Sequence, residues 1–262
     1  MLLSPTALQD VVFDGTYAGL LSAVFECYRL KLSQARLIAE QDFQPGLFAA
    51  PLWVSTQDAH TNRVLAAIEK RGGKSALSLL QRCWLSEAPD RSAIIYRYIQ
   101  RLVEGVDQPE QDVSDQLMHR LSRLRQQMGR EMHRMHAFVR FQATPDDLYV
   151  ALIEPDFDVL PLLEDHFAKR YPAQEWLIYD VRRRYGLYWD QRKRSASFIT
   201  LDGRINQEKR LKENVLSEVE TDYQVLWKTY FDAVDIPERR NLKLHFQHVP
   251  KRYWKYLVEK WG

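Results

Sequence analysis

The sequence contains little cysteine and little glycine. It has only 2 cysteines in 262 residues, whereas an iron–sulfur cluster typically requires about four thiolates. The 10 glycines argue against the glycine-rich loops of cofactor-binding folds. Both cysteines, Cys27 and Cys83, lie in apolar segments with helical spacing. We therefore expect buried, reduced thiols in a cytoplasmic protein.

Long apolar runs and common nucleotide-binding motifs are also missing. The longest apolar stretch, Gly46 to Val54, is interrupted by Pro51 and is far shorter than the roughly 20 residues that span a bilayer. Gly72-Gly73-Lys74-Ser75 ends like a phosphate-binding loop, but Ile68 occupies the place of its first glycine, so we interpret it as a helix stop. We expect no membrane association, no signal peptide, no metal ion and no cofactor.

The chain is rich in aromatic residues, and its charged residues are unevenly distributed. The net charge is only +2, but residues 1–116 contain 11 basic and 14 acidic side chains, whereas residues 117–262 contain 26 and 21. Aromatic residues make up 12% of the chain, more than a core alone needs. A basic half with spare rings favours a polyanionic partner such as nucleic acid. The alternative is an ordinary solvated surface.

Hydrophobic periodicity predicts an α+β fold that is predominantly helical. Short strands are expected at 11–13 and 52–56, with Thr16 capping the helix that follows the first of them. Three regions are expected: a helical N-terminal region (1–115), a small antiparallel sheet with covering helices (116–205), and a long helix with a basic aromatic tail (206–262).

The sheet is predicted from the order strand, strand, helix, strand, strand. A hairpin turn at Thr144-Pro145-Asp146-Asp147 separates the first two strands. This order is typical of an antiparallel sheet covered on one face by helix. The expected strands are 137–142, 148–154, 176–179 and 185–189, and the helix is 158–170.

The clearest predicted helix covers residues 116–136. Its apolar residues fall within one arc of about 80°, and Glu131 lies at the edge of that arc. A carboxylate there must reach solvent or find a buried partner, and we expect Arg140 or Arg182 to be that partner. Four arginines form a separate stripe on the helix: Arg120, Arg123, Arg130 and Arg134.

Acid–base chemistry has four candidate residues: Glu131, His133, His166 and Asp180. His133 and His136 are three residues apart and in principle able to share a metal ion. No recognised ligand spacing repeats, so hydrogen-bonded or surface histidines are the better interpretation. Whether the chain is itself an enzyme stays open at this point.

Nucleic-acid contacts have two candidate groups. Arg140, Arg170 and Arg182 are expected to meet at one rim of the sheet, with structural ion pairs as the alternative. The tail interleaves cations, which attract phosphates, with rings, which stack on bases. Alternatively, Tyr253 and Trp254 dock the tail on the core. The tail candidates are Arg239, Arg240, Asn241, Lys243, Lys251, Arg252, Tyr253, Trp254 and Lys255.

Several stretches together carry a family resemblance. They are FDGTYAGLLSAVFECY at 13–28, RMHAFVRFQ at 134–142, EPDFDVLPLLEDHFAKRYPAQEWLIYD at 154–180 and IPERRNLKLHFQHVPKRYWKYLVEKW at 236–261. With these stretches the chain resembles an uncharacterised bacterial family described as DNA metabolism or DNA repair proteins. The resemblance spans nearly the whole chain, but it brings no catalytic residues with it.

The resemblance implies a setting for the chain. Members of this family are encoded beside a radical-SAM protein thought to act on DNA, or are fused to a uracil-DNA-glycosylase-like domain. We expect the stand-alone form here, because no stretch is left for the fused domain. With two cysteines, the chain is not expected to be the cluster-bearing radical enzyme.

Three hypotheses remain open from the sequence. The first is a DNA-binding component of a repair or modification system that works with a radical-SAM partner. The second is a nucleic-acid-processing enzyme, such as a lyase, nuclease or glycosylase. The third is a protein-interaction scaffold that does not bind DNA.

Overall fold

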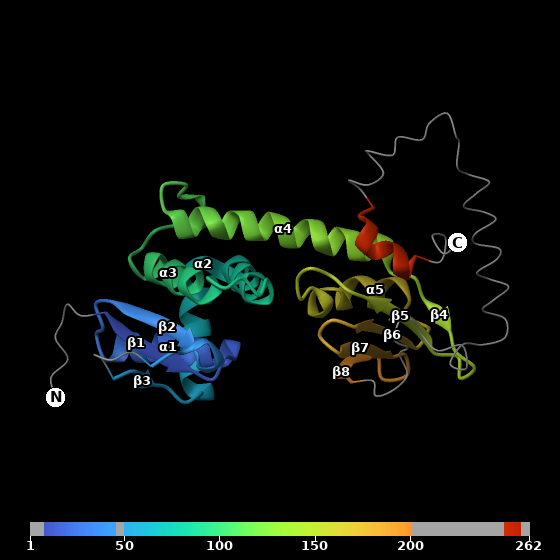
Figure 1. Ribbon diagram of the computed structural model, residues 1–262, viewed down its shortest axis with the longest axis horizontal. Helices are drawn as coiled ribbons and strands as arrows, with labels where there is room; N and C mark the ends of the chain where they lie inside the picture. Colours follow the sequence, from blue (N-terminus) through green and yellow to red (C-terminus); the bar gives the residue numbers. More distant parts are fainter. Residues whose placement is uncertain (1–7, 46–49, 201–248, 258–262) are drawn as a thin grey trace. The chain divides into compact units, whose positions relative to one another are not determined.

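The structure, a computed structural model, describes residues 8–45, 50–200 and 249–257. It has an α+β fold, which confirms the predicted class. The chain divides into two compact units, Met1–Met128 and Gly129–Gly262 (Figure 1). The three regions expected from the sequence stay a prediction, because most of the third lies outside the described residues, together with the predicted helix at 207–233.

The first unit contains a parallel sheet that the sequence did not predict. Its strands are β1 (Gln9–Phe13), β2 (Ala35–Ala39) and β3 (Leu52–Trp53), in the order β2-β1-β3. Both β2 and β3 pair parallel with β1. The central strand is buried from Val11 to Phe13, as expected for a parallel strand covered on both faces. The expected sheet in the second unit is therefore not the only one in the described chain.

The first helix begins directly after β1. Thr16 caps α1 (Tyr17–Arg29) by accepting a hydrogen bond from the Gly19 amide, as predicted. The Asp14 carboxylate accepts hydrogen bonds from the Thr16 amide and hydroxyl, and from the Thr56 hydroxyl at 2.6 Å. Asp14 therefore fixes the turn that carries the chain from β1 into α1.

Two further helices pack in this unit. They are α2 (Asp58–Leu85) and α3 (Arg91–Val103). Gly73 interrupts α2 with a φ of 68°, a left-handed conformation that favours glycine, so the predicted helix stop appears as a kink. Leu20, Leu80 and Ile95 are fully buried where α1, α2 and α3 meet in the core. Burial of such side chains is the main source of folding free energy.

The boundary between the two units falls within α4 (Gln116–Phe138). Its predicted apolar arc is confirmed, because Leu121, Leu124 and Met135 are buried. The helix is longer than predicted and continues through Phe138, so only Gln142 of the strand predicted at 137–142 lies in a strand. The helical spacing of apolar residues persists to Val139, which is also buried and whose amide donates to the Met135 carbonyl.

The second unit contains a five-stranded sheet in the order β4-β5-β6-β7-β8. The antiparallel prediction is wrong for one pair: β5 and β6 run parallel, so the sheet is mixed. The reason is the connection at 154–175, which includes helix and is long enough to return the chain to the starting end of β5. The strands are β4 (Gln142–Ala143), β5 (Tyr149–Ile153), β6 (Trp176–Asp180), β7 (Tyr185–Asp190) and β8 (Ser195–Ile199).

The connection between β5 and β6 differs in detail from the predicted helix at 158–170. It contains a 3₁₀ turn, η3 (Leu160–Leu162), and the shorter α5 (Glu164–Arg170). Strand β8 was not predicted, because its sequence SASFI is small and polar apart from Phe198 and Ile199. In the tail, the described residues form a 3₁₀ helix, η6 (Lys251–Tyr256). Among the described residues, no helix has the length and apolar character needed to cross a membrane.

Candidate nucleic-acid interface and its buried polar support

Glu131 is the centre of a buried polar network in the second unit. Its side chain lies on α4 and is 1% exposed. The carboxylate accepts hydrogen bonds from the Tyr253 hydroxyl and from the Asp156 amide at 2.8 Å. It also pairs with Arg252 at 3.2 Å and with Arg134 at 3.3 Å. The predicted burial of Glu131 is confirmed, and its partners satisfy the buried charge.

The predicted cation partners of Glu131 were wrong. Arg140 lies beyond the end of α4, and its guanidinium donates to the Ala137 carbonyl at 2.7 Å. Arg182 donates to the Asp156 carbonyl at 3.2 Å. Arg140 was expected to lie on the strand at 137–142, but α4 extends through Phe138 and that strand begins only at Gln142. The tail takes this place and brings Arg252 to Glu131.

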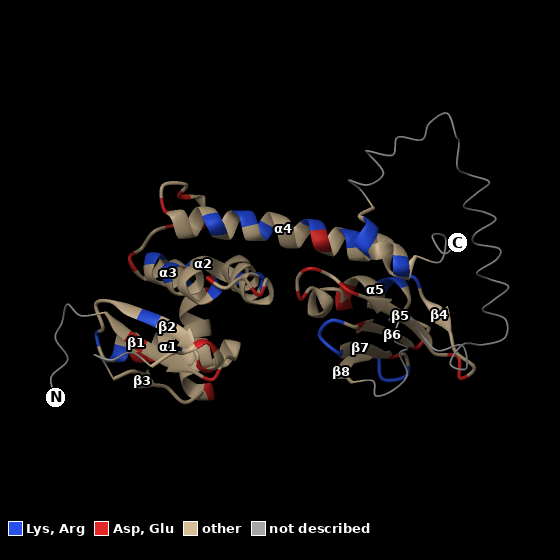
Figure 2. Ribbon diagram, in the orientation of Figure 1, with Lys and Arg blue, Asp and Glu red and all other residues tan. Residues whose placement is uncertain are grey.

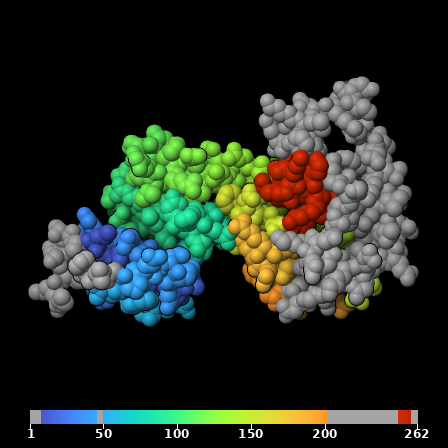
Figure 3. All heavy atoms as spheres, viewed as in Figure 1, coloured from blue at the N-terminus to red at the C-terminus, as the bar shows by residue number. Residues whose placement is uncertain are grey.

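The tail residues from 249 to 257 dock on the second unit. Tyr256 donates to Glu154 at 2.9 Å, and Lys255 pairs with the same carboxylate. Burial and the hydrogen bond to Glu154 raise the pKa of Tyr256 above its ordinary range. Tyr253 is 2% exposed, so its ring has no face open to a nucleobase. Figure 3 shows these residues (red) at the surface beside the yellow part of the second unit.

Arg252 and Trp254 contribute to this docking. Burial lowers the pKa of Arg252, but the neighbouring Tyr253 and Glu131 outweigh it, so the pKa is raised and the guanidinium stays charged. Arg252 also pairs with Asp156 at 2.7 Å. The half-buried Trp254 donates its indole N–H to the Val249 carbonyl at 3.1 Å. For this part of the tail, the docking alternative describes the contacts.

Asp180 ends β6 and is fully buried at 0% exposure. Its carboxylate accepts the Arg182 and Arg183 amides at 2.9 and 3.1 Å and pairs with the Arg183 guanidinium at 2.7 Å. Arg183 also reaches the Asp156 carbonyl at 3.3 Å. Asp156 thus connects Asp180 with Glu131 in one network. Both carboxylates hold structure, since each is buried and already accepts several hydrogen bonds.

Among the described residues, neither His133 nor His166 makes a hydrogen bond or ion pair with this network. His133 is exposed on α4. His166 on α5 stacks on His136 with ring centroids 3.9 Å apart and an angle of 13°. Burial lowers the pKa of His136, assisted by His166 and His133; burial and Arg170 lower the pKa of His166. The four predicted acid–base residues therefore do not assemble into one site.

Two hairpin turns in the second unit share one pattern. We call Val181–Arg184, between β6 and β7, the first arginine turn, and Gln191–Arg194, between β7 and β8, the second arginine turn. Each follows an aspartate and reads Asp-x-Arg-basic-Arg. Figure 2 shows both turns in blue, at the two ends of β7. The sequence hypothesis included only Arg182 from these turns, although the repeated spacing was visible in the sequence.

The second arginine turn reproduces the hydrogen bonding of the first. Asp190 accepts the Arg192 and Lys193 amides at 2.9 and 3.0 Å, and it pairs with the Lys193 ammonium at 3.2 Å. The last residue of each turn has a positive φ, 60° at Arg184 and 52° at Arg194. In both turns the aspartate pairs with the middle cation, and the first and last arginines are exposed, although Arg182 also donates to the Asp156 carbonyl.

Four arginines are therefore exposed in two pairs: Arg182, Arg184, Arg192 and Arg194. None of them has a carboxylate within ion-pair distance among the residues that the structure describes. Unpaired, exposed guanidinium groups are the usual donors to phosphate oxygens. A ligand phosphate would therefore meet them without first breaking an ion pair.

An exposed aromatic ring lies between the two arginine turns. Phe198 on β8 is 58% exposed and pairs in register with Leu187, in the middle of β7. Its ring is 5.7 Å from that of Tyr185. Sequence reasoning missed Phe198, because it searched for rings in the tail. A ring between two cationic turns offers a stacking surface for an unpaired base.

The other predicted contact residues have varied positions. Arg170 is exposed and lies over the Tyr171 ring at 5.6 Å, and Lys251 is exposed on η6. Four tail candidates lie outside the described residues: Arg239, Arg240, Asn241 and Lys243. Within the described ranges, no group of three or more His, Cys, Asp or Glu side chains is arranged to hold a metal ion.

The region that contains this network and both arginine turns matches a family model. The chain belongs to the DUF4130 family, a domain of unknown function, whose model matches residues 89–259. The match covers α3, α4, every strand of the second unit and η6. No curated protein and no solved structure matches the chain.

Proposed function

We propose that this protein binds nucleic acid through the two arginine turns and Phe198, in DNA repair or DNA metabolism. The observation that carries this proposal is the pair of Asp-x-Arg-basic-Arg turns, each with two exposed arginines that no carboxylate of residues 8–45, 50–200 or 249–257 neutralises. The buried aspartate network fixes the first turn, so its arginines are held in place before a ligand arrives. Preorganised cations lose less conformational entropy on binding.

The spacing of the turns suits a polynucleotide backbone. Strand β7 has 6 residues, and at about 3.4 Å per residue its ends lie about 17 Å apart. Phosphates of one strand in duplex DNA are spaced about 3.4 Å along the axis, so the turns match phosphates about five positions apart. Phe198 lies between them, where an unpaired base would meet its ring. The exposed ring of Phe198, rather than the phosphate spacing, therefore favours single-stranded or locally opened nucleic acid.

Fluorescence anisotropy with labelled single-stranded and duplex oligonucleotides, measured across a salt series, tests the proposal. Arg182→Ala with Arg184→Ala should flatten the slope of log K against log salt by about 1.4, because each single-strand phosphate contact contributes about 0.7. Arg192→Ala with Arg194→Ala should do the same. Phe198→Ala should weaken single-strand binding by about 1–3 kcal/mol per stacked base and leave the salt slope unchanged.

A charge-matched control separates a site from general electrostatics. Lys70→Ala with Lys169→Ala removes two exposed cations outside both arginine turns. This variant should bind with nearly wild-type affinity and salt slope. Equal behaviour of the control and both arginine variants would overturn the proposed site. Wild-type binding in every variant would overturn the proposed site and make the arginine stripe on α4 the next candidate.

The proposal includes a partner and a cellular location. The family resemblance implies that the chain works with a radical-SAM protein in the cytoplasm, and the chain's own two buried cysteines supply no cluster site. Affinity purification from the native cell, with and without nuclease, tests the partnership. Recovery of a radical-SAM protein after nuclease treatment supports direct contact, whereas its loss indicates that both proteins share only the nucleic acid.

A further inference from the structure

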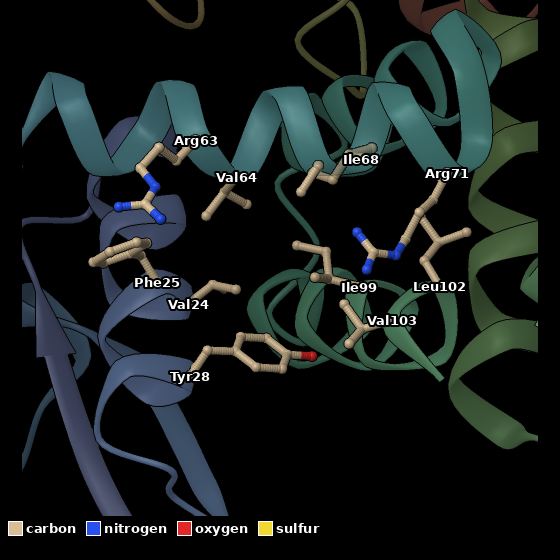
Figure 4. Close-up of a pocket in the computed structure, with 11 residues that line it drawn as sticks. Val24, Phe25, Tyr28, Arg63, Val64, Ile68, Arg71, Ile99, Leu102 and Val103 are labelled. Atoms are coloured by element: carbon tan, nitrogen blue, oxygen red, sulfur yellow. The ribbon is translucent and has the colours of Figure 1, made fainter. Parts of the chain in front are cut away.

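Helices α1, α2 and α3 of the first unit line an apolar hollow of about 210 Å³. Phe25 and Tyr28 of α1, Val64 and Ile68 of α2, and Ile99 of α3 contribute to its lining (Figure 4). Tyr28 is partly exposed at the rim, so the hollow opens to solvent. The proposed nucleic-acid interface lies in the second unit and does not use this space.

Two arginines give the hollow a chemical preference. Arg63 and Arg71 are eight residues apart on α2, and Figure 4 shows both guanidinium groups on the side of α2 that carries Val64 and Ile68. Arg63 lies over the Phe25 ring at 5.2 Å. Neither arginine has a carboxylate partner among the described residues, and no acidic side chain lines the hollow. An apolar space with two unpaired cations complements an anion that carries an apolar body.

We propose that this hollow binds a small amphiphilic carboxylate, such as a short acyl or aryl acid. The apolar body would fill the space between α1, α2 and α3, and the carboxylate would pair with Arg63 or Arg71 at one end of that space. Pockets for drug-sized ligands have about 300–1,000 Å³, so the smaller hollow here selects a smaller molecule. Burial of the apolar body supplies affinity, and the guanidinium groups select the charge.

Isothermal titration calorimetry on the full chain with three probes of equal chain length tests this inference. The probes are octanoate, octanol and octylammonium. Octanoate should bind saturably, octanol should bind about tenfold or more weakly, as expected for loss of a charge-assisted hydrogen bond, and octylammonium should bind least. Equal affinity for octanoate and octylammonium, or no octanoate binding, would overturn the proposal.

Variants of exposed or pocket-lining residues complete the test. Arg63→Ala with Arg71→Ala should reduce octanoate affinity to that of octanol and leave octanol binding unchanged, whereas Lys70→Ala, an exposed neighbour on α2 outside the hollow, should change neither. Ala67→Phe should fill the hollow and abolish the binding of both octanoate and octanol. If circular dichroism shows that this variant is unfolded, Ala67→Leu is tested in its place. Octanoate binding that survives both the charge and the filling variants would refute the site.

A protein partner is the competing occupant, and it has its own outcome. A synthetic Leu/Glu amphipathic helix serves as the probe, because acidic side chains that flank an apolar stripe would also complement the two arginines. Binding of this peptide without any binding of octanoate would overturn the small-molecule proposal. The result is independent of the nucleic-acid experiments, which concern the second unit.

Discussion

Tyr253 donates its hydroxyl hydrogen bond to the buried Glu131 carboxylate across 121 intervening positions of the chain. Arg252, the preceding residue, pairs with the same carboxylate. Burial and this hydrogen bond raise the pKa of Tyr253 above its ordinary range, so the phenol stays a donor at all physiological pH values. Glu131 therefore anchors the tail on α4 through both residues.

This anchoring predicts a large stability effect. Glu131→Gln should lower the free energy of unfolding by about 3 kcal/mol, because it removes the buried charge that pairs with Arg252 and Arg134 and weakens several hydrogen bonds. Tyr253→Phe keeps the ring against Phe138 and removes two hydrogen bonds with charged groups, the one donated to Glu131 and the one accepted from Arg252, which should cost at least about 1.5–3 kcal/mol. Urea denaturation measures both values.

A surface substitution provides the reference for that measurement. Asp165→Asn changes a carboxylate that is almost fully exposed, and should alter stability by no more than about 0.5 kcal/mol. If Glu131→Gln also stays within that range, the carboxylate contributes nothing to the docking of the tail. The double variant with Tyr253→Phe should lose less than the sum of the two single losses, because both act on one contact.

Local patterns predicted part of this arrangement. The helical spacing of Leu121 and Leu124 predicted α4, and the place of Glu131 at the edge of that arc predicted its burial. Its partners Arg252 and Tyr253 were not predictable, because they are far from Glu131 in the sequence and local hydrophobic periodicity carries no information about long-range contacts. The two arginine turns carried a readable signal, the repeated Asp-x-Arg-basic-Arg spacing.

The direction of β6 relative to β5 and the existence of strand β8 could not be predicted from local sequence patterns, for physical reasons. Apolar alternation predicts that a segment is extended, but it does not report whether β5 runs with or against β6. That direction depends on the path of the connecting segment. Strand β8 lacks regular alternation because most of its side chains face solvent, so its exposed Phe198 went unnoticed as a functional candidate.

The two cysteines should be unreactive in the folded protein. Burial raises the pKa of Cys27 to about 11 and that of Cys83 to about 12, so almost no thiolate exists at neutral pH. Ellman's reagent should react with neither thiol in buffer and with both in denaturant. Ser78→Cys, at an exposed position on α2, provides the reactive control. Rapid reaction of the native wild-type protein would show that the core of the first unit opens readily.

The stacked histidines predict how the stability of the second unit depends on pH. Burial is the main cause that lowers the pKa of both His136 and His166 below the value of about 6.5 that they have in an unfolded chain. Protonation of His136 is also opposed by the charges of His166 and His133, and protonation of His166 is opposed by the charge of Arg170. The pair therefore favours its neutral form in the folded state.

The sign of the effect follows from proton binding. As the pH falls below about 6.5, the unfolded chain takes up protons that the folded histidines resist, so the free energy of unfolding decreases. Above that pH both states are neutral and the contribution is fully present. His136→Phe with His166→Phe keeps two stacked rings and should flatten the fall in melting temperature between about pH 7.5 and 5.5. His119→Gln, an exposed histidine on α4, should leave the wild-type dependence intact. An unchanged pH dependence in the double phenylalanine variant would mean that the pair does not titrate in this range.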